Sequence, residues 1–129
     1  MKVSLVFRLN RFIRFLLKGL GKKETEHYLF TLPRGLSDVQ LYCALAEHGW
    51  QPNYLGFVYS GQVYQCRRLV NRGKHQYHVR FYAKGDRTRV TGHFEIAPEW
   101  DTGDHLAGVD LRTMTMTEAK TLRSKVGMT

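Results

Sequence analysis

Two runs of strand-forming residues, separated by Gly85-Asp86, constrain most strongly what this chain can fold into. Residues 75–84 and 87–96 are rich in aromatic and β-branched side chains. Gly-Asp is an accepted two-residue turn between antiparallel strands. The pattern therefore predicts a β-hairpin in which Lys84 pairs with Arg87.

This hairpin register brings chemically active side chains together on one face of a sheet. It places His78 directly opposite His93, with Glu95 two residues further along the same face. The Cβ atoms of directly opposed residues lie roughly 4.5–5.5 Å apart. Two imidazoles and a carboxylate are therefore expected to share one small area of sheet.

The rest of the chain predicts further strands and helices around this hairpin. A helix is expected from Ser37, where Ser37 and Gln40 form a capping box, to His48. Beyond it the pattern predicts a polar acidic loop at 98–105 and a short helix at 117–126. Further strands are expected at residues 27–32, 54–59 and 62–70. We expect an α+β fold: an antiparallel, four- to five-stranded meander sheet with one helix packed on one face.

The chain divides into two regions, 1–23 and 24–129. Residues 24–129 are expected to form a single compact α+β domain. Residues 1–23 read as a basic amphipathic helix, over 3–20, followed by a linker. The arginines of this segment interrupt its apolar run, which argues against a membrane span. Three uses of the helix are open: packing on protein, lying on an anionic membrane, or docking into a larger partner, with contacts expected from Arg8, Arg11, Phe12, Leu16 and Lys18.

Composition favours a partner of negative charge. The 129 residues include 20 Lys and Arg against 11 Asp and Glu, a formal net charge of +9. Such an excess favours nucleic acid or an acidic membrane surface. Two cysteines are too few for a disulfide framework, so we expect the protein in the cytoplasm or at the membrane surface facing it.

Strict alternation along the strands predicts a core face and an open polar face. If the hairpin between 62–70 and 75–84 also has a two-residue turn, Arg67 lies beside His78 and Gln65 beside Arg80. An open face of this kind suits nucleic acid, because guanidinium groups bind phosphate and aromatic rings stack on bases. The residues expected to bind nucleic acid are Arg67, Arg80, Tyr82, Arg87 and Arg89.

Three interpretations of His78 and His93 remain open. They could act as acid and base in metal-independent phosphodiester cleavage, with Glu95 orienting His93. They could bind a metal with Glu95, joined by His105 or Asp104. They could also contribute only to a binding surface, which is the interpretation we favour. Because neighbouring arginines would repel a cation, we expect no metal and no cofactor.

We therefore expect a nucleic-acid-binding protein, with RNA or a single strand favoured as the partner. The binding surface is the basic, histidine-containing sheet face. One alternative is a metal-independent ribonuclease that uses His78 and His93. The other is a membrane-peripheral protein or a subunit of a complex, attached through its N-terminal helix.

Overall fold

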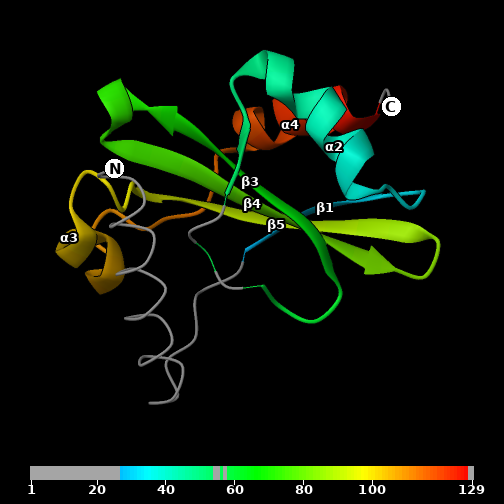
Figure 1. Cartoon of the computed structure of the whole chain (residues 1–129), viewed down its shortest axis with the longest axis horizontal. Helices are drawn as coiled ribbons and strands as arrows, with labels where there is room; N and C mark the ends of the chain where they lie inside the picture. The colour runs from blue at the N-terminus through cyan, green and yellow to red at the C-terminus, as the bar shows by residue number, and fades with distance from the viewer. Residues whose placement is uncertain (1–26, 54–55, 57, 128–129) are drawn as a thin grey trace.

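The computed structural model describes residues 27–53, 56 and 58–127. They form an α+β fold around a five-stranded antiparallel sheet in the order β1-β5-β4-β3-β2 (Figure 1). The α-helices are α2 (Asp38–Leu45), α3 (Thr102–Ala107) and α4 (Met116–Gly127), and short 3-10 turns follow α2 and β3 at Ala46–His48 and Asn71–Gly73. The strands are β1 (Tyr28–Leu32), β2 (Gln51–Pro52), β3 (Gln62–Val70), β4 (His75–Lys84) and β5 (Arg87–Ile96).

The structure confirms the predicted register of both hairpins. Between β4 and β5, Lys84 pairs with Arg87 and His78 with His93. Between β3 and β4, Arg67 pairs with His78. Arg72 and Gly73 in the connecting turn have φ angles of 59° and 88°. Positive φ at both central residues matches the twist of a hairpin, which explains why this weaker turn signal still gives the expected pairing.

Two elements differ from the sequence prediction. Of the strand expected over 54–59, the structure describes residues 56 and 58–59, and these are not in a strand. The edge strand is instead β2, where proline is tolerated because its missing N–H faces away from the sheet. The predicted loop at 98–105 contains the start of α3, which Asp101 caps by accepting a hydrogen bond from the backbone N–H of Asp104.

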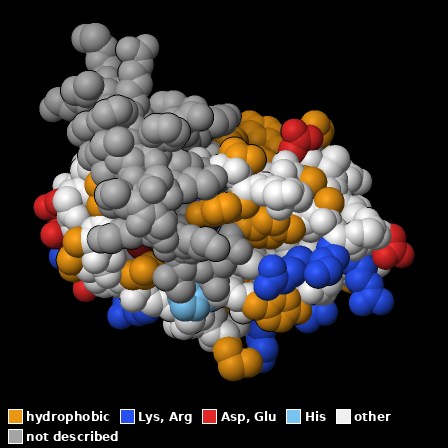
Figure 2. All heavy atoms as spheres, turned by 90° about the horizontal axis from the view of Figure 1, so that it is seen from below, with side chains coloured by type: hydrophobic (Ala, Val, Ile, Leu, Met, Phe, Trp, Pro, Cys, Tyr) orange, Lys and Arg blue, Asp and Glu red, His pale blue; other side chains and the backbone are white. Residues whose placement is uncertain are grey.

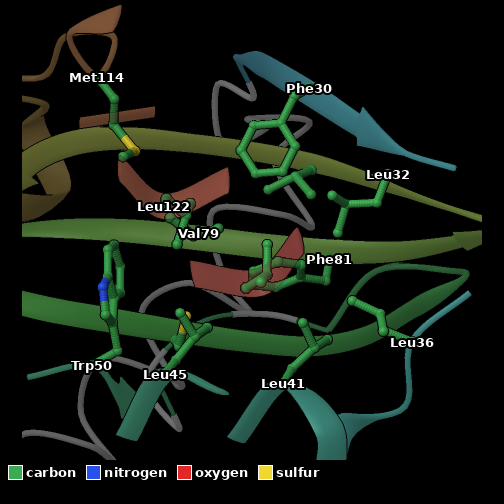
Figure 3. Packing of buried hydrophobic residues seen from close by; sticks show 13 residues of the cluster. Phe30, Leu32, Leu36, Leu41, Leu45, Trp50, Val79, Phe81, Met114 and Leu122 are labelled. Atoms are coloured by element: carbon green, nitrogen blue, oxygen red, sulfur yellow. The ribbon is translucent and has the colours of Figure 1, made fainter. Parts of the chain in front are cut away.

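One face of the sheet carries the apolar core, and two helices contribute to it. Leu41 and Leu45 of α2 are fully buried, as are Leu122 and Val126 of α4. Figure 3 shows Leu41 and Leu45 pointing toward the strands. The expectation of one covering helix is therefore incomplete. The core cluster comprises Phe30, Leu32, Leu36, Leu41, Leu45, Trp50, Cys66, Val79, Phe81, Val90, Met114, Leu122 and Val126.

The amphipathic helix predicted at 3–20, with its proposed contact residues, lies outside the described residues. Within the part of the chain that is described, no helix combines the length and apolar character needed to span a membrane.

Replacing Leu45 with alanine should destabilise the fold by about 2–5 kcal/mol, because it removes a fully buried side chain and leaves a cavity. Urea unfolding of the full chain, followed by circular dichroism, measures this loss as a lower midpoint. Val39→Ala is the matched control in the same helix, since Val39 is exposed. It should change stability by no more than about 0.5 kcal/mol. Equal losses for the two variants would contradict the packing described here.

Candidate functional site

The polar face of the sheet is buried, so the expectation of an open face is wrong. His78 and His93 each retain 1% of their accessible surface, Arg80 2% and Glu95 4%. Arg67 is buried as well. These side chains form a second, polar interior on the face opposite the apolar core.

Residues of α3 and of the segment that precedes β3 lie against this polar interior. The α3 helix contributes His105, which is buried against β5. The main chain at Gly56 lies so close that a Cβ atom there would be 2.5 Å from Gln65 Oε1 and 3.0 Å from His78 Cε1. The Gly56 carbonyl accepts a hydrogen bond from Gln65 Nε2 at 3.3 Å. A glycine is therefore needed for this backbone to approach the site.

At the centre of the face, three histidines surround one carboxylate. His78, His93, Glu95 and His105 are named here the histidine–glutamate cluster. Glu95 Oε2 lies 2.8 Å from His93 Nε2 and 3.4 Å from His78 Nδ1. Glu95 Oε1 lies 3.2 Å from His105 Nδ1. The His78 and His93 rings meet edge to face, with centroids 5.2 Å apart.

The hydrogen bond made by His78 Nε2 determines which protonation states of Nδ1, the nitrogen near Glu95, are compatible with the structure. Since Gln65 Nε2 donates to the Gly56 carbonyl, Gln65 Oε1 accepts from His78 Nε2 at 2.9 Å. In a neutral imidazole with a proton on Nε2, Nδ1 is an acceptor. Nδ1 and Glu95 Oε2 would then be two acceptors facing each other. The arrangement needs a positive charge there, either a proton on Nδ1 or a metal ion.

The surroundings of Glu95 keep it ionised. Burial alone would raise the pKa of this carboxyl, since a charge is poorly solvated in the interior. The attraction of His93 and hydrogen bonds from His78 and His93 outweigh burial and hold the pKa well below its ordinary value. Gln76 Nε2 also donates to Glu95 Oε2, at 3.0 Å. The cluster therefore contains a buried anion that accepts hydrogen bonds from several sides.

A row of polar side chains connects the cluster to the segment that precedes α3. Arg67 Nη1 donates to Gln76 Oε1 at 3.1 Å and to Glu99 Oε1 at 2.6 Å. A second bond, from Arg67 Nη2 to Glu99 Oε2, makes the ion pair bidentate. Burial would raise the pKa of Glu99, but the hydrogen bonds and charge of Arg67 lower it further than burial raises it. Arg67 is thus neutralised by Glu99.

The cluster has the dimensions of a metal site. One ligand atom from each of His78, His93 and Glu95 lies within 4.8 Å of the others. Tetrahedral zinc with bonds of about 2.0–2.2 Å separates its ligand atoms by roughly 3.4 Å. The His78–Glu95 distance of 3.4 Å matches this separation, whereas His93 Nε2 and Glu95 Oε2, at a hydrogen-bonding distance of 2.8 Å, would have to move apart on metal binding. His105 Nδ1 donates to the Ile96 carbonyl at 2.7 Å, so this nitrogen is not a ligand, and the ligand atoms that converge are those of His78, His93 and Glu95.

The other residues predicted for the site lie elsewhere. Arg87 is exposed and Tyr82 half-buried, both toward the end of the β4–β5 hairpin. Arg89 lies over the ring of Tyr28, 5.5 Å from its centroid. Asp104, considered as a metal ligand, is exposed and its backbone N–H bonds to Asp101.

Sequence reasoning assigned no role to Gln76, Glu99 or Gly56. The hairpin register could have identified Gln76, because it pairs with Glu95 across the strands. For Glu99 no such signal exists, since 32 residues separate it from Arg67. The sequence gives no indication of the role of Gly56 either, because its contacts with the cluster depend on the tertiary fold.

Replacing Glu99 with glutamine should reduce stability at pH 7 by about 1.5–3 kcal/mol, because buried Arg67 loses its charged acceptor. The pKa of Glu99 is lowered on folding, so its contribution is present above the unfolded-state pKa of about 4.3 and is lost at lower pH. The difference from the unmodified protein should therefore shrink below about pH 4.3. Chemical denaturation at pH 7 and pH 3.5 measures both values. A difference that does not depend on pH, or an equal one for the exposed Glu47→Gln, would contradict this account.

Comparisons with known proteins add no assignment to this geometry. No family model matches the chain, and neither the curated proteins nor the solved structures contain a match. The side chains themselves are therefore the basis for inferring function.

Proposed function

We propose that this protein binds one divalent transition-metal ion of the zinc type through His78, His93 and Glu95. The observation that carries the proposal is the convergence of three buried ligand atoms within 4.8 Å. Gln65 supports it, because its Oε1 accepts from His78 Nε2 and Nδ1, 3.4 Å from Glu95, is the ring nitrogen positioned to ligate a metal. Metal-bound histidines characteristically donate their other ring N–H to an oxygen in this way.

A carboxylate balances the charge of one of the two buried arginines near the cluster. Arginines near the histidines argue against a metal only if their charge is uncompensated. Arg67 forms a bidentate pair with Glu99. Arg80 lies over the ring of Tyr59, with its Cζ 4.8 Å from the centroid, where the electron-rich face attracts its charge. Glu95 contributes a buried negative charge that a metal ion would neutralise.

Three protein ligands would leave one coordination position of the ion open. Structural zinc sites have four protein ligands, whereas catalytic sites have three and leave one position for water. Such a water becomes a nucleophile near neutral pH. Because His78, His93 and Glu95 retain only 1–4% of their accessible surface, bulk substrate does not reach that position, and we infer metal binding without hydrolysis. Metal-independent cleavage by His78 and His93 has less support, because their buried rings are only 5.2 Å apart and both approach Glu95.

The purified full chain should bind one equivalent of Zn²⁺ or Co²⁺. Glu95→Gln and His93→Ala should each weaken binding by more than the roughly 10–100-fold typical of losing an outer-shell partner. Isothermal titration calorimetry and elemental analysis after dialysis measure affinity and stoichiometry. His48→Ala is the matched control, because His48 is exposed and lies outside the cluster. Metal binding that survives both ligand substitutions, or that His48→Ala also abolishes, would rule out the assigned ligands.

A second candidate, nucleic-acid binding, has support from exposed cations near the β4–β5 turn. Figure 2 views the face of the molecule away from α2 and α4 and shows Lys and Arg side chains gathered toward this end. Lys84 and Arg87 are exposed there, and Arg89 is half-buried beside the aromatic ring of Tyr28. We place the phosphate contacts on this surface and no longer on Arg67 and Arg80, because those two arginines are buried. Attachment to a membrane or a protein partner through residues 3–20 stays a prediction.

If this second candidate is correct, the full chain should bind single-stranded RNA with an affinity that falls steeply with salt, because bound counterions are released. Arg87→Ala combined with Arg89→Ala should weaken binding and reduce the slope of log K against log [salt] by about 1–2. Fluorescence anisotropy at several salt concentrations measures both effects. The control is Arg123→Ala, which also removes an exposed arginine but lies on α4, away from this hairpin, and should leave binding and slope unchanged. An unchanged salt slope in the double variant would move RNA contacts away from this hairpin.

A further inference from the structure

We propose that Arg67 is a positioning residue for the metal-binding carboxylate and acts through the amide of Gln76. This inference rests on the proposed metal centre. The three side chains come from three adjacent strands: Arg67 from β3, Gln76 from β4 and Glu95 from β5. Hydrogen bonds join them in one line, from Arg67 Nη1 to Gln76 Oε1 and from Gln76 Nε2 to Glu95 Oε2.

Arg67 selects the orientation of the Gln76 amide. A guanidinium group only donates hydrogen bonds, so it must face the amide oxygen. The amide nitrogen then points at Glu95, 3.0 Å from Oε2. A flipped amide would place its oxygen against the carboxylate and its NH2 against the guanidinium, which is unfavourable at both ends. Because Gln76 retains only 2% of its accessible surface, bulk water cannot compensate for either clash.

The oxygen that Gln76 holds is the one that faces the other two ligands. Glu95 Oε2 is 2.8 Å from His93 Nε2 and 3.4 Å from His78 Nδ1. A fixed donor at this oxygen restricts rotation of the carboxylate. Glu99 in turn holds the guanidinium by two parallel hydrogen bonds, which limits its rotation as well. The row Glu99–Arg67–Gln76 therefore sets the position of the metal-binding oxygen.

The next residue along the strand offers a matched control. Arg68 also forms an arginine–glutamate pair, at 2.5 Å from Glu118 Oε1, and its guanidinium lies over the rings of Trp50 and Tyr77. It points to the other face of β3, away from the histidine–glutamate cluster. Arg67→Met and Arg68→Met thus each remove one ion pair, but only the first affects the Gln76 amide.

The experiment is a titration of the full chain with Co²⁺, in which the visible absorption bands of the bound ion are measured. It compares the unmodified protein with four variants: Arg67→Met, Arg68→Met, Gln76→Leu and the double variant Arg67→Met/Gln76→Leu. We expect Arg67→Met and Gln76→Leu each to weaken Co²⁺ binding by about 10–100-fold and to alter the absorption bands, which report ligand geometry. Arg68→Met should leave affinity and spectrum unchanged within about twofold. The double variant should match Gln76→Leu alone, since Arg67 acts through that amide. Arg67→Lys, which keeps a donor, should recover part of the affinity.

The outcomes separate this inference from the proposed function. If the unmodified protein does not bind Co²⁺ at one equivalent, the metal centre itself is wrong. If it binds and Arg67→Met binds equally well, or if the effects of Arg67→Met and Gln76→Leu simply add, the positioning role is overturned. Should Arg67→Met fail to fold, as judged by thermal unfolding, Arg67→Lys and Gln76→Leu still decide: a normal spectrum and affinity in Gln76→Leu would overturn the role.

Discussion

A carboxylate buried in the middle of a β-sheet is the constraint on which the polar side of this structure depends. An ionised group in the interior is stable only when charged partners and hydrogen-bond donors replace its hydration shell. Glu95 meets this condition with imidazole groups from β4, β5 and α3 and with the amide of Gln76. Those partners have requirements of their own, which bring in Gln65, Arg67 and finally Glu99. One buried negative charge thus accounts for the identity of most residues on this face.

The sheet consequently separates two interiors that are stabilised by different physics. On the side of α2 and α4, the core consists of aliphatic and aromatic side chains whose burial removes apolar surface from water. On the other side, the interior is a connected set of hydrogen bonds and ion pairs. The Cys66 thiol on the apolar side illustrates the difference, because burial there raises its pKa strongly and keeps it neutral. Glu95, also fully enclosed, remains charged because donors surround it.

Local sequence predicted β1, β3, β4 and β5 and the register of the two hairpins, but neither the edge strand β2 nor the burial of the polar face. Gly85-Asp86 and the alternating residues on either side specify the β4–β5 pairing, and the Ser37 and Gln40 capping box specifies the start of α2. The juxtaposition of His78, His93 and Glu95 followed directly from that register. The cover did not, because Arg, Gln and Thr at outward positions are equally typical of a solvated strand. Whether they are covered depends on the Gly56 backbone and on the segment that precedes α3, where Glu99 contacts Arg67 across 32 residues of sequence.

Successive side chains of a strand point into different interiors. Neighbouring positions of one strand are therefore expected to tolerate amino-acid substitutions differently during evolution. At Val79 or Phe81, another apolar side chain of similar volume can be accommodated by repacking, so the sequence there can drift in small steps. At Gln76, His78 and Arg80, in the same strand, no substitute has the same donors and acceptors in the same places. A change at one of these positions leaves a buried polar atom without its partner and requires a simultaneous change on a neighbouring strand. Neighbouring residues of β4 are therefore expected to diverge at different rates, one set gradually and the other only in coordinated groups.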